Sequence, residues 1–195
     1  MSIETNGANV LGIGGTLSPR STSELALRHC LAAAEELGAR TRMITAAQLE
    51  MPMYQWGVAD GCAAAQELLD AVRWADHVVI SSPGYHGGMS GLLKNALDYL
   101  QELAEESSPY LDGKAVGCIV TAAGWQAGAT VLGSLRDTIH ALRGWATPLG
   151  VVVNSSVSPF APDGSVIDPG LDAKLRLLAE QVAGFPVAAR RSIAV

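Results

Sequence analysis

Residues 8–31 read ANVLGIGGTLSPRSTSELALRHCL. A short apolar run at residues 10–13 leads into glycines, and a loop rich in hydroxyl side chains follows. Apolar residues then return at helical spacing from Leu25 onward. This order predicts a strand, a loop and the start of a helix. Because a helix N-terminus offers unpaired N–H groups and a partial positive charge, we expect the loop to receive an anion such as a phosphate.

The glycine pattern of this loop excludes two common nucleotide-binding motifs. A P-loop requires a Gly-Lys pair that is absent after this strand, and a dinucleotide fingerprint requires a third glycine where Leu17 stands. The remaining possibility is a hydroxyl-rich loop of the kind that wraps a terminal phosphomonoester. The alternative is a helix cap, with Ser21 as the N-cap residue and Glu24 three positions later. Both roles can hold at once.

The composition indicates one soluble domain over residues 1–195, with flexible tails expected at 1–8 and 186–195. Apolar residues make up 49% of the chain and charged residues 16%, so a sizeable core is expected. The net charge of −6 and the lack of any Lys/Arg cluster argue against nucleic acid as a partner. The chain also lacks a signal-peptide pattern and an apolar run of membrane length.

The cysteines and histidines do not indicate a disulfide framework or a metal site. The three cysteines are scattered without CxxC spacing, which fits thiols in a reducing compartment and predicts a cytoplasmic protein. His29, His77 and His140 lie in expected helices or strands without ligand partners at suitable spacing. We therefore predict that the protein has no metal site.

The rest of the chain alternates between strand and helix patterns. Runs such as Val78-Val79-Ile80 are β-branched without polar alternation, which is typical of strands buried on both faces of a parallel sheet. The alternation predicts an open, doubly wound α/β sheet, in which ligands bind beyond the carboxyl ends of the strands. Later strands are expected at 41–45, 76–82, 116–120 and 151–153, and later helices at 63–74, 92–103, 129–142 and 172–183.

Two further loops should meet the first one at that edge of the sheet. Residues 82–90, SPGYHGGMS, are rich in glycine, so their backbone can approach a flat ligand closely. Residues 121–128, TAAGWQAG, again place small residues around one aromatic side chain. One loop suited to a phosphate and two loops suited to a flat ring together indicate a mononucleotide with a planar base.

The run SPGYHGGMSGLLKNALDYL at residues 82–100 resembles the signature of NAD(P)H-dependent FMN reductases, P-x-Y-N-G-S-x-P-G-x-L-K-N-A-[IL]-D. The first loop, GGTLSPRSTSELAL, is similar to the G-S-L-R-x-x-S-x-N phosphate loop of that family, and TAAGW resembles its third loop. The likeness extends over about residues 10–153. It implies a flavodoxin-like fold, which is a doubly wound sheet of five parallel strands in the order 2-1-3-4-5 with helices on both faces.

The resemblance also implies a set of FMN-binding residues. The first loop would hold the phosphate, the second would line the isoalloxazine ring, and the third would meet the other edge of the ring. This chain departs from the family pattern at three places: Ser18 replaces an Arg, Ser23 replaces an Asn, and His86-Gly87-Gly88 replaces Asn-Gly-Ser. The expected cofactor-binding residues are Thr16, Ser18, Arg20, Ser21, Thr22, Ser23, Pro83, Gly84, Tyr85, His86, Gly87, Gly88, Thr121, Ala122, Ala123, Gly124 and Trp125.

On this resemblance, we expect an NAD(P)H-dependent flavin oxidoreductase that passes hydride from NADPH or NADH to FMN and supplies reduced FMN to a partner monooxygenase. The alternatives are a quinone- or azo-type reductase that keeps FMN bound and, from another class, a flavodoxin-like electron carrier. Because the cofactor supplies the chemistry, no catalytic side chain is predicted. Main-chain N–H groups of residues 85–88 are expected to stabilise the negative charge of reduced flavin.

Self-association is also expected, as a homodimer or homotetramer. The apolar stripe on residues 92–103 looks wider than one sheet contact needs, which predicts a partner helix from a second copy. The loop at residues 46–60 carries apolar side chains that either tuck under the core or line a pocket or partner surface. The stripe comprises Leu92, Leu93, Ala96, Leu97, Leu100 and Leu103.

Overall fold

The computed structural model describes residues 7–18 and 21–187. At its centre is a sheet whose parallel strands lie in the order β2-β1-β3-β5-β6. This arrangement confirms the predicted α/β fold with flavodoxin-like strand order. A short strand, β4, pairs antiparallel with the end of β3, and the sequence patterns did not indicate it. The strands are β1 (Asn9–Gly14), β2 (Arg40–Thr45), β3 (His77–Tyr85), β4 (Gly88–Met89), β5 (Ala115–Ala122) and β6 (Trp145–Asn154).

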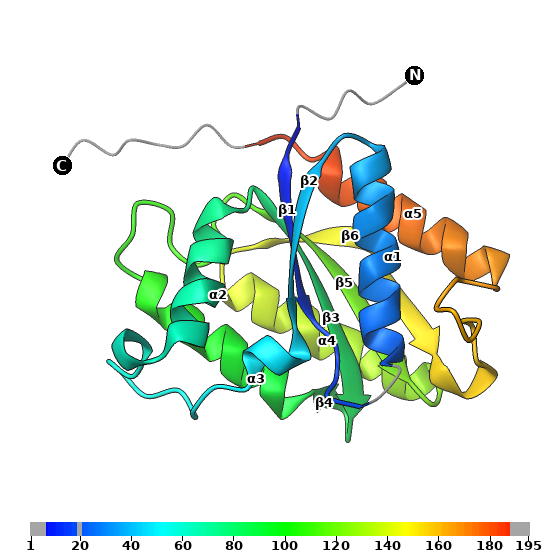
Figure 1. The fold of residues 1–195 in the computed structure, drawn as a ribbon, viewed down its shortest axis with the longest axis horizontal. Coiled ribbons are helices and arrows are strands. Elements are labelled where there is room, and N and C mark those ends of the chain that lie inside the picture. Colours follow the sequence, from blue (N-terminus) through cyan, green and yellow to red (C-terminus); the bar gives the residue numbers. More distant parts are fainter. Residues whose placement is uncertain (1–6, 19–20, 188–195) are drawn as a thin grey trace.

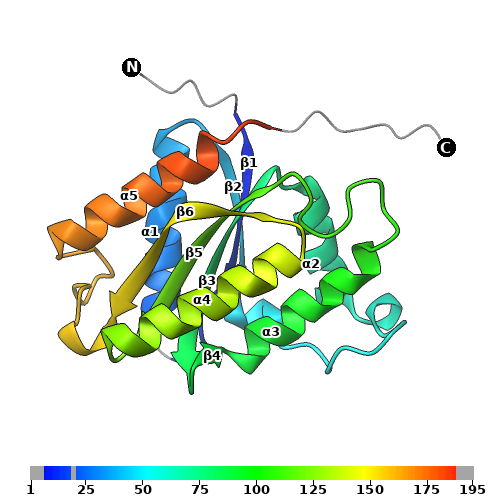
Figure 2. The same ribbon diagram turned by 180° about the vertical axis from the view of Figure 1, so that it is seen from behind.

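Helices cover both faces of this sheet. Figure 1 shows α1 and α5 together on one side, and the view from behind in Figure 2 shows α3 and α4 on the other side, with α2 beside them. Two separate groups of buried apolar side chains correspond to these two layers. The helices are α1 (Thr22–Glu36), α2 (Ala63–Trp74), α3 (Gly91–Asp98), α4 (Trp125–Ala141) and α5 (Pro169–Ala183).

The central strand β3 shows why its sequence lacks polar alternation. Successive side chains of a strand point to opposite faces, and here both faces are covered. Val78 and Ile80 belong to the core under α2, α3 and α4, whereas Val79 belongs to the core under α1 and α5. Apolar residues are therefore required at every position along this part of the strand.

Several predicted boundaries were wrong for identifiable reasons. Strand β3 continues to Tyr85 because its last residues pair with β4. Helix α4 begins at Trp125 rather than at residue 129. Gly128, which looked like a loop residue, packs against the sheet inside this helix: a Cβ there would lie 2.2 Å from Cγ1 of Val152. Strand β6 begins at Trp145, six residues before the predicted start.

The apolar stripe at residues 92–103 was also misinterpreted. The predicted helix divides into α3 and a 3₁₀ helix, Tyr99–Leu103, which turn the side chains of the stripe into the core of this chain. Leu92 alone of the six is only partly buried, and the other five are buried. The width of the stripe therefore reflects the packing of this chain and gives no reason to expect a partner helix.

The ends of the described chain lie at the amino edge of the sheet (Figure 1). Ala8 is buried, and its carbonyl accepts a hydrogen bond from the N–H of Arg40, so this residue of the predicted N-terminal tail is held against the sheet. Most of both predicted tails lies outside the described residues. In residues 7–18 and 21–187 we find no helix that is both long enough and apolar enough to cross a membrane.

Candidate functional site

The register of the sheet brings the three predicted loops to one edge. Gly14 at the end of β1 lies opposite Ser81 of β3. Farther along, Pro83 lies opposite Thr121 of β5. In Figure 1 these strand ends point downward, where β4 and the start of α1 also lie. Loops that are about 70 and 40 residues apart in the sequence therefore meet at the carboxyl edge, as predicted.

The first loop leaves the sheet through two glycines in the left-handed region. Gly14 has φ +131° and Gly15 has φ +105°. The N–H of Gly15 donates to the carbonyl of Ser81 at 3.1 Å, which fixes the point of departure. The loop then enters α1, whose N-cap is Ser21, as predicted. The Ser21 hydroxyl accepts from the N–H groups of Glu24 and Thr16, at 3.1 and 3.0 Å.

The hydroxyl groups of this loop divide into two sets. Ser21 and Ser23 are buried, and their hydroxyls lie 3.0 Å apart in a hydrogen bond. Ser18 is exposed, while Thr16 and Thr22 are half-buried. These three hydroxyls, with the N–H groups of the first turn of α1, form the set of donors that can reach an anion at the surface.

A carboxylate stands close to this set of donors. The Glu24 side chain packs beside Gly15, and its carboxylate forms an ion pair of 2.7 Å with Arg28 one turn farther along α1. The ion pair offsets the negative charge of Glu24 near the loop. Arg20, which was expected to supply positive charge there, lies outside the described residues.

The second loop is a tight hairpin. Tyr85 pairs with Gly88, so His86 and Gly87 alone form the turn. Both have positive φ, +50° and +88°, which is typical of the two-residue turns that match the twist of a hairpin. Tyr85 is 52% exposed, and His86 and Gly87 are exposed with it.

Pro83 and Gly84, which were predicted to line a flat ligand from the second loop, lie within β3 before its exposed end at Tyr85. Pro83 is buried, and Gly84 is half-buried, where a Cβ would lie 3.0 Å from the side chain of Val131 in α4. Gly84 therefore allows α4 to pack closely against the end of the strand. The exposed part of the hairpin is limited to the residues at its tip.

The third loop is shorter than predicted. Thr121 and Ala122 are buried at the end of β5, and only Ala123 and Gly124 precede α4. Trp125 is the first residue of that helix and is 60% exposed. Because Gly124 has no side chain to cap the helix, the N–H groups of the first turn remain available at this edge.

The sequence analysis assigned no role at this edge to the surface loop after β6. The hydroxyl of Ser156 donates to the carbonyl of Ala123 at 2.8 Å, and its N–H donates to the side chain of Asn154 at 2.9 Å. This loop therefore braces the third loop from the side. One serine among several in a polar segment carries no local signal of such a contact, so the sequence alone could not have revealed it.

The edge fits a mononucleotide with a planar ring. Hydroxyl and N–H donors gather at the first loop, and the exposed aromatic side chains of Tyr85 and Trp125 belong to the other two. At Gly87 and Gly124 a Cβ would meet nothing within 4 Å, so the missing side chains leave open space above the backbone. A phosphate and a flat ring are the two groups that such donors and such space accommodate.

The titratable side chains do not suggest a nucleophile or a metal centre. Burial raises the pKa of the Cys30 and Cys118 thiols to about 12, so both stay protonated at neutral pH. Within residues 7–18 and 21–187, no group of three or more His, Cys, Asp or Glu side chains could hold a metal ion.

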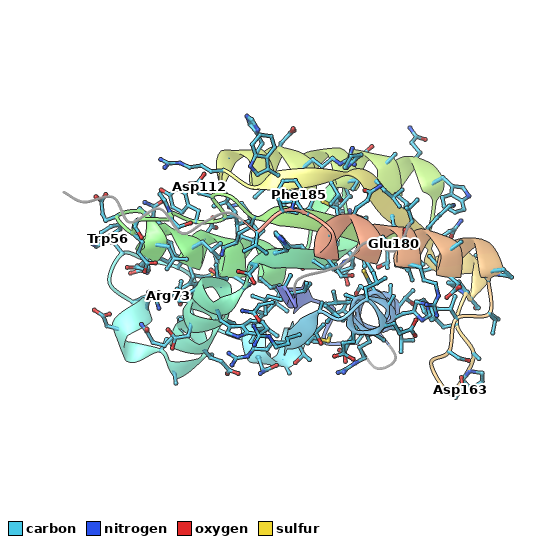
Figure 3. The ribbon with its side chains drawn as sticks, turned by 90° about the horizontal axis from the view of Figure 1, so that it is seen from above. Trp56, Arg73, Asp112, Asp163, Glu180 and Phe185 are labelled. Carbon is cyan, nitrogen blue, oxygen red and sulfur yellow. The ribbon has the colours of Figure 1, made fainter. Side chains whose placement is uncertain are left out.

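A cavity of about 480 Å³ lies at the opposite edge of the sheet. Its wall includes Arg73, Asp112 and Lys114, and Figure 3 looks onto this edge with the first two labelled. Arg73 is already paired with Asp70 and Glu106. Because the cavity lies beyond the amino ends of the strands, it is separate from the three convergent loops.

Comparison with known proteins points to one family of enzymes. The sequence profile described as NADPH-dependent FMN reductase matches residues 8–158. An FMN-dependent NADPH-azoreductase of Staphylococcus aureus is 31% identical over 122 residues, which are 62% of this chain and 61% of that protein. The match thus spans less than two thirds of the length of the azoreductase.

Solved structures share the fold. The flavoenzyme NAD(P)H:(acceptor) oxidoreductase FerB from Paracoccus denitrificans superimposes with a TM-score of 0.73 at 20% identity, covering 91% of this chain and 98% of that one. The apo form of an NADH:FMN oxidoreductase superimposes with a TM-score of 0.69 at 22% identity, covering 90% of this chain and 88% of that one. Because the family profile matches most of the chain, including all three loops, the chain belongs to the NADPH-dependent FMN reductase family.

Proposed function

We propose that this protein is an NAD(P)H-dependent flavin oxidoreductase that binds FMN at the carboxyl edge of its sheet. The observation that carries the proposal is the convergence of a hydroxyl-rich helix start, a glycine hairpin and an exposed tryptophan in one place. A phosphate group and a flat ring can be held there together. When bound, FMN supplies the capacity to accept a hydride from a nicotinamide nucleotide.

The first loop holds the phosphate in this proposal. The donors are the N–H groups of Thr22 and Ser23 at the start of α1 and the hydroxyls of Thr16, Ser18 and Thr22. The buried hydroxyls of Ser21 and Ser23 instead maintain the shape of the loop, because they bond to each other and the Ser21 hydroxyl also accepts from two main-chain N–H groups. Arg20 stays a predicted contributor of positive charge.

The ring lies against the hairpin and the start of α4. His86 and Gly87 are outside the β3–β4 pairing, so their N–H groups are available to negative charge on a reduced ring. Tyr85 and Trp125 flank the ring, and Gly88, Ala123 and Gly124 let the backbone approach it. Pro83, Gly84, Thr121 and Ala122 act from within the sheet by setting where the two loops begin.

The electron acceptor distinguishes the candidate activities. In the leading candidate, reduced FMN leaves and serves a partner monooxygenase. The second candidate is an azo- or quinone-type reductase that keeps FMN bound, and the similarity to the Staphylococcus aureus azoreductase favours it specifically. A flavodoxin-like electron carrier is the alternative from another class, and such a carrier would not be reduced directly by NADPH.

The proposal extends to the assembly and the location of the protein. Residues 1–195 are taken as one flavin-binding domain that forms a homodimer or homotetramer. Met53 and Trp56, which are 74% and 73% exposed, supply an apolar surface for the second copy. The three cysteines are free, which is compatible with a cytoplasmic location.

The test is a visible absorption spectrum of the purified protein, repeated under anaerobic conditions after NADPH is added. A yellow protein that NADPH bleaches supports a resident flavin and the azo- or quinone-type candidate. A colourless protein that catalyses the bleaching of added FMN supports the diffusible-flavin candidate. A protein that binds FMN but is bleached by neither NADPH nor NADH is a carrier, and one that neither binds nor reduces FMN refutes the proposal.

A further inference from the structure

We propose that Ser81 and Ser82, neighbours in β3, are positioning residues that hold the two halves of the flavin site separately. Ser81 holds the phosphate loop, and Ser82 holds the hairpin that lies against the ring. The inference rests on the proposed function, because it concerns the same site. The sequence analysis attached no role to either serine.

The two serines lie where the apolar run of β3 ends. Both are completely buried, and alternation along the strand turns them to opposite faces of the sheet. Ser81 faces α1 and Ser82 faces the start of α3, as their hydrogen bonds show. A buried hydroxyl is unfavourable unless it is hydrogen-bonded, and both are.

Ser81 ties both ends of the phosphate loop to the sheet. Its hydroxyl donates to the carbonyl of Ser23 in α1 at 2.8 Å, and its own carbonyl accepts from the N–H of Gly15 at 3.1 Å. Gly15 and Ser23, on either side of the loop, are thus both hydrogen-bonded to one residue of β3. Glycine is required at residue 14 by this closure, because a Cβ there would lie 1.9 Å from the carbonyl oxygen of Ser81.

A chain of hydroxyl groups continues from Ser23 into the loop. The Ser21 hydroxyl accepts from the N–H groups of Thr16 and Glu24, which occupy both of its lone pairs. Its O–H must therefore donate to the hydroxyl of Ser23. Thr22 lies between these two anchored serines, so the first N–H group of α1 is held in a fixed direction.

Ser82 performs the equivalent closure on the other face. Its hydroxyl donates to the carbonyl of Pro83 at 2.8 Å and accepts from the N–H of Ser90 at 3.0 Å. Ser90 is itself the N-cap of α3 and accepts from the N–H of Leu93. This hydroxyl therefore adds a link at the base of the hairpin, next to the Gly84–Met89 pair of the β3–β4 ladder.

The two closures share no hydrogen bond, so they can be disturbed one at a time. A loop that is already held in its binding conformation loses less conformational freedom when a ligand binds. Loss of the Ser81 hydroxyl should therefore weaken the binding of the phosphate alone, and loss of the Ser82 hydroxyl should weaken the binding of the ring. Riboflavin separates these effects because it carries the ring without the phosphate.

The experiment measures dissociation constants of FMN and of riboflavin by flavin fluorescence for the wild type, Ser81→Ala and Ser82→Ala. For Ser81→Ala we expect the dissociation constant of FMN to rise about tenfold, while that of riboflavin changes by less than about twofold. For Ser82→Ala we expect both flavins to weaken by the same factor, so that their ratio is preserved. Ser107→Ala, at an exposed position on the opposite edge, is the matched control and should leave both constants unchanged.

A second variant keeps the test decisive if Ser81→Ala does not fold. Ser81→Cys keeps a side chain of similar size, but its thiol is a weaker donor to the carbonyl of Ser23, and it should show the same FMN-selective loss. Equal weakening of both flavins in Ser81→Ala or Ser81→Cys overturns the inference. A wild type that binds neither flavin refutes the proposed function instead, so the two failures are distinguishable.

Discussion

At the scale of single residues, Gly14 shows how closely β1 and β3 approach before the chain leaves the sheet. Its φ of +131° is strained for any residue with a Cβ, and that Cβ would collide with the Ser81 carbonyl. We expect Gly14→Ala to lower the free energy of unfolding by about 2–4 kcal/mol, measured by urea denaturation. The matched control is Gly61→Ala, where a Cβ meets nothing within 4 Å, and its change should stay within about 0.5 kcal/mol. Equal stability of the two variants would contradict this account of Gly14.

At the scale of elements, His77 joins the beginnings of β3 and β5 to the end of α5. Its Nδ1 accepts from the N–H of Ala115 at 3.2 Å, so Nε2 carries the proton and donates to the carbonyl of Phe185 at 3.0 Å. The ring also meets the Phe185 ring edge-on, with 5.7 Å between centroids. Burial lowers the pKa of His77; the hydrogen bond to Phe185 and the carboxylate of Asp76 oppose this, and Lys114 adds to it.

The sign of the pH effect follows from this lowered pKa. In the unfolded chain His77 takes up a proton below about pH 6.5, whereas the folded protein resists protonation until a lower pH. The contribution of His77 to the free energy of unfolding is therefore fully present above about pH 6.5. It declines as the pH falls below that value, by at most about 1.4 kcal/mol per pH unit. His77→Gln should show a shallower decline in urea denaturation between pH 7 and 5, and His140→Gln, at an exposed position, should follow the wild type. If the stabilities of the wild type and His77→Gln decline in parallel between pH 7 and 5, another group is responsible for the loss of stability at low pH.

At the scale of the whole molecule, the surface that we propose for a second copy lies on the loop between β2 and α2. The Asn95 side chain fixes this loop, because it donates to the carbonyl of Pro52 at 2.9 Å and accepts from the N–H of Tyr54 at 2.8 Å. The loop thus presents Trp56 toward one end of the long axis of the molecule (Figure 3). Asn95 belongs to the LKNALD signature, and the structure gives it the role of holding this loop.

Self-association through this surface can be measured by sedimentation over a range of concentrations. We expect Trp56→Ser to weaken self-association at least tenfold, since buried tryptophans are typical of the energetic centres of interfaces. Trp145→Ser removes a similarly exposed tryptophan from the start of β6 and should leave the assembly unchanged. A wild type that remains monomeric at every concentration would refute the proposed oligomer.

The sequence by itself determined the parallel sheet, the strand order that its family resemblance implies, and the edge at which the three loops meet. Uninterrupted apolar runs reveal doubly buried strands, and Ser21 before a helical pattern reveals a cap, because these signals depend on neighbours in the sequence. Only the tertiary structure decided that Gly128 packs against Val152, that the stripe at residues 92–103 is covered by its own chain, and that Ser81 and Ser82 brace two different loops. The physical reason is that these roles depend on contacts between residues far apart in the sequence, and a glycine or a serine looks the same along the chain whether it faces solvent or a packed neighbour.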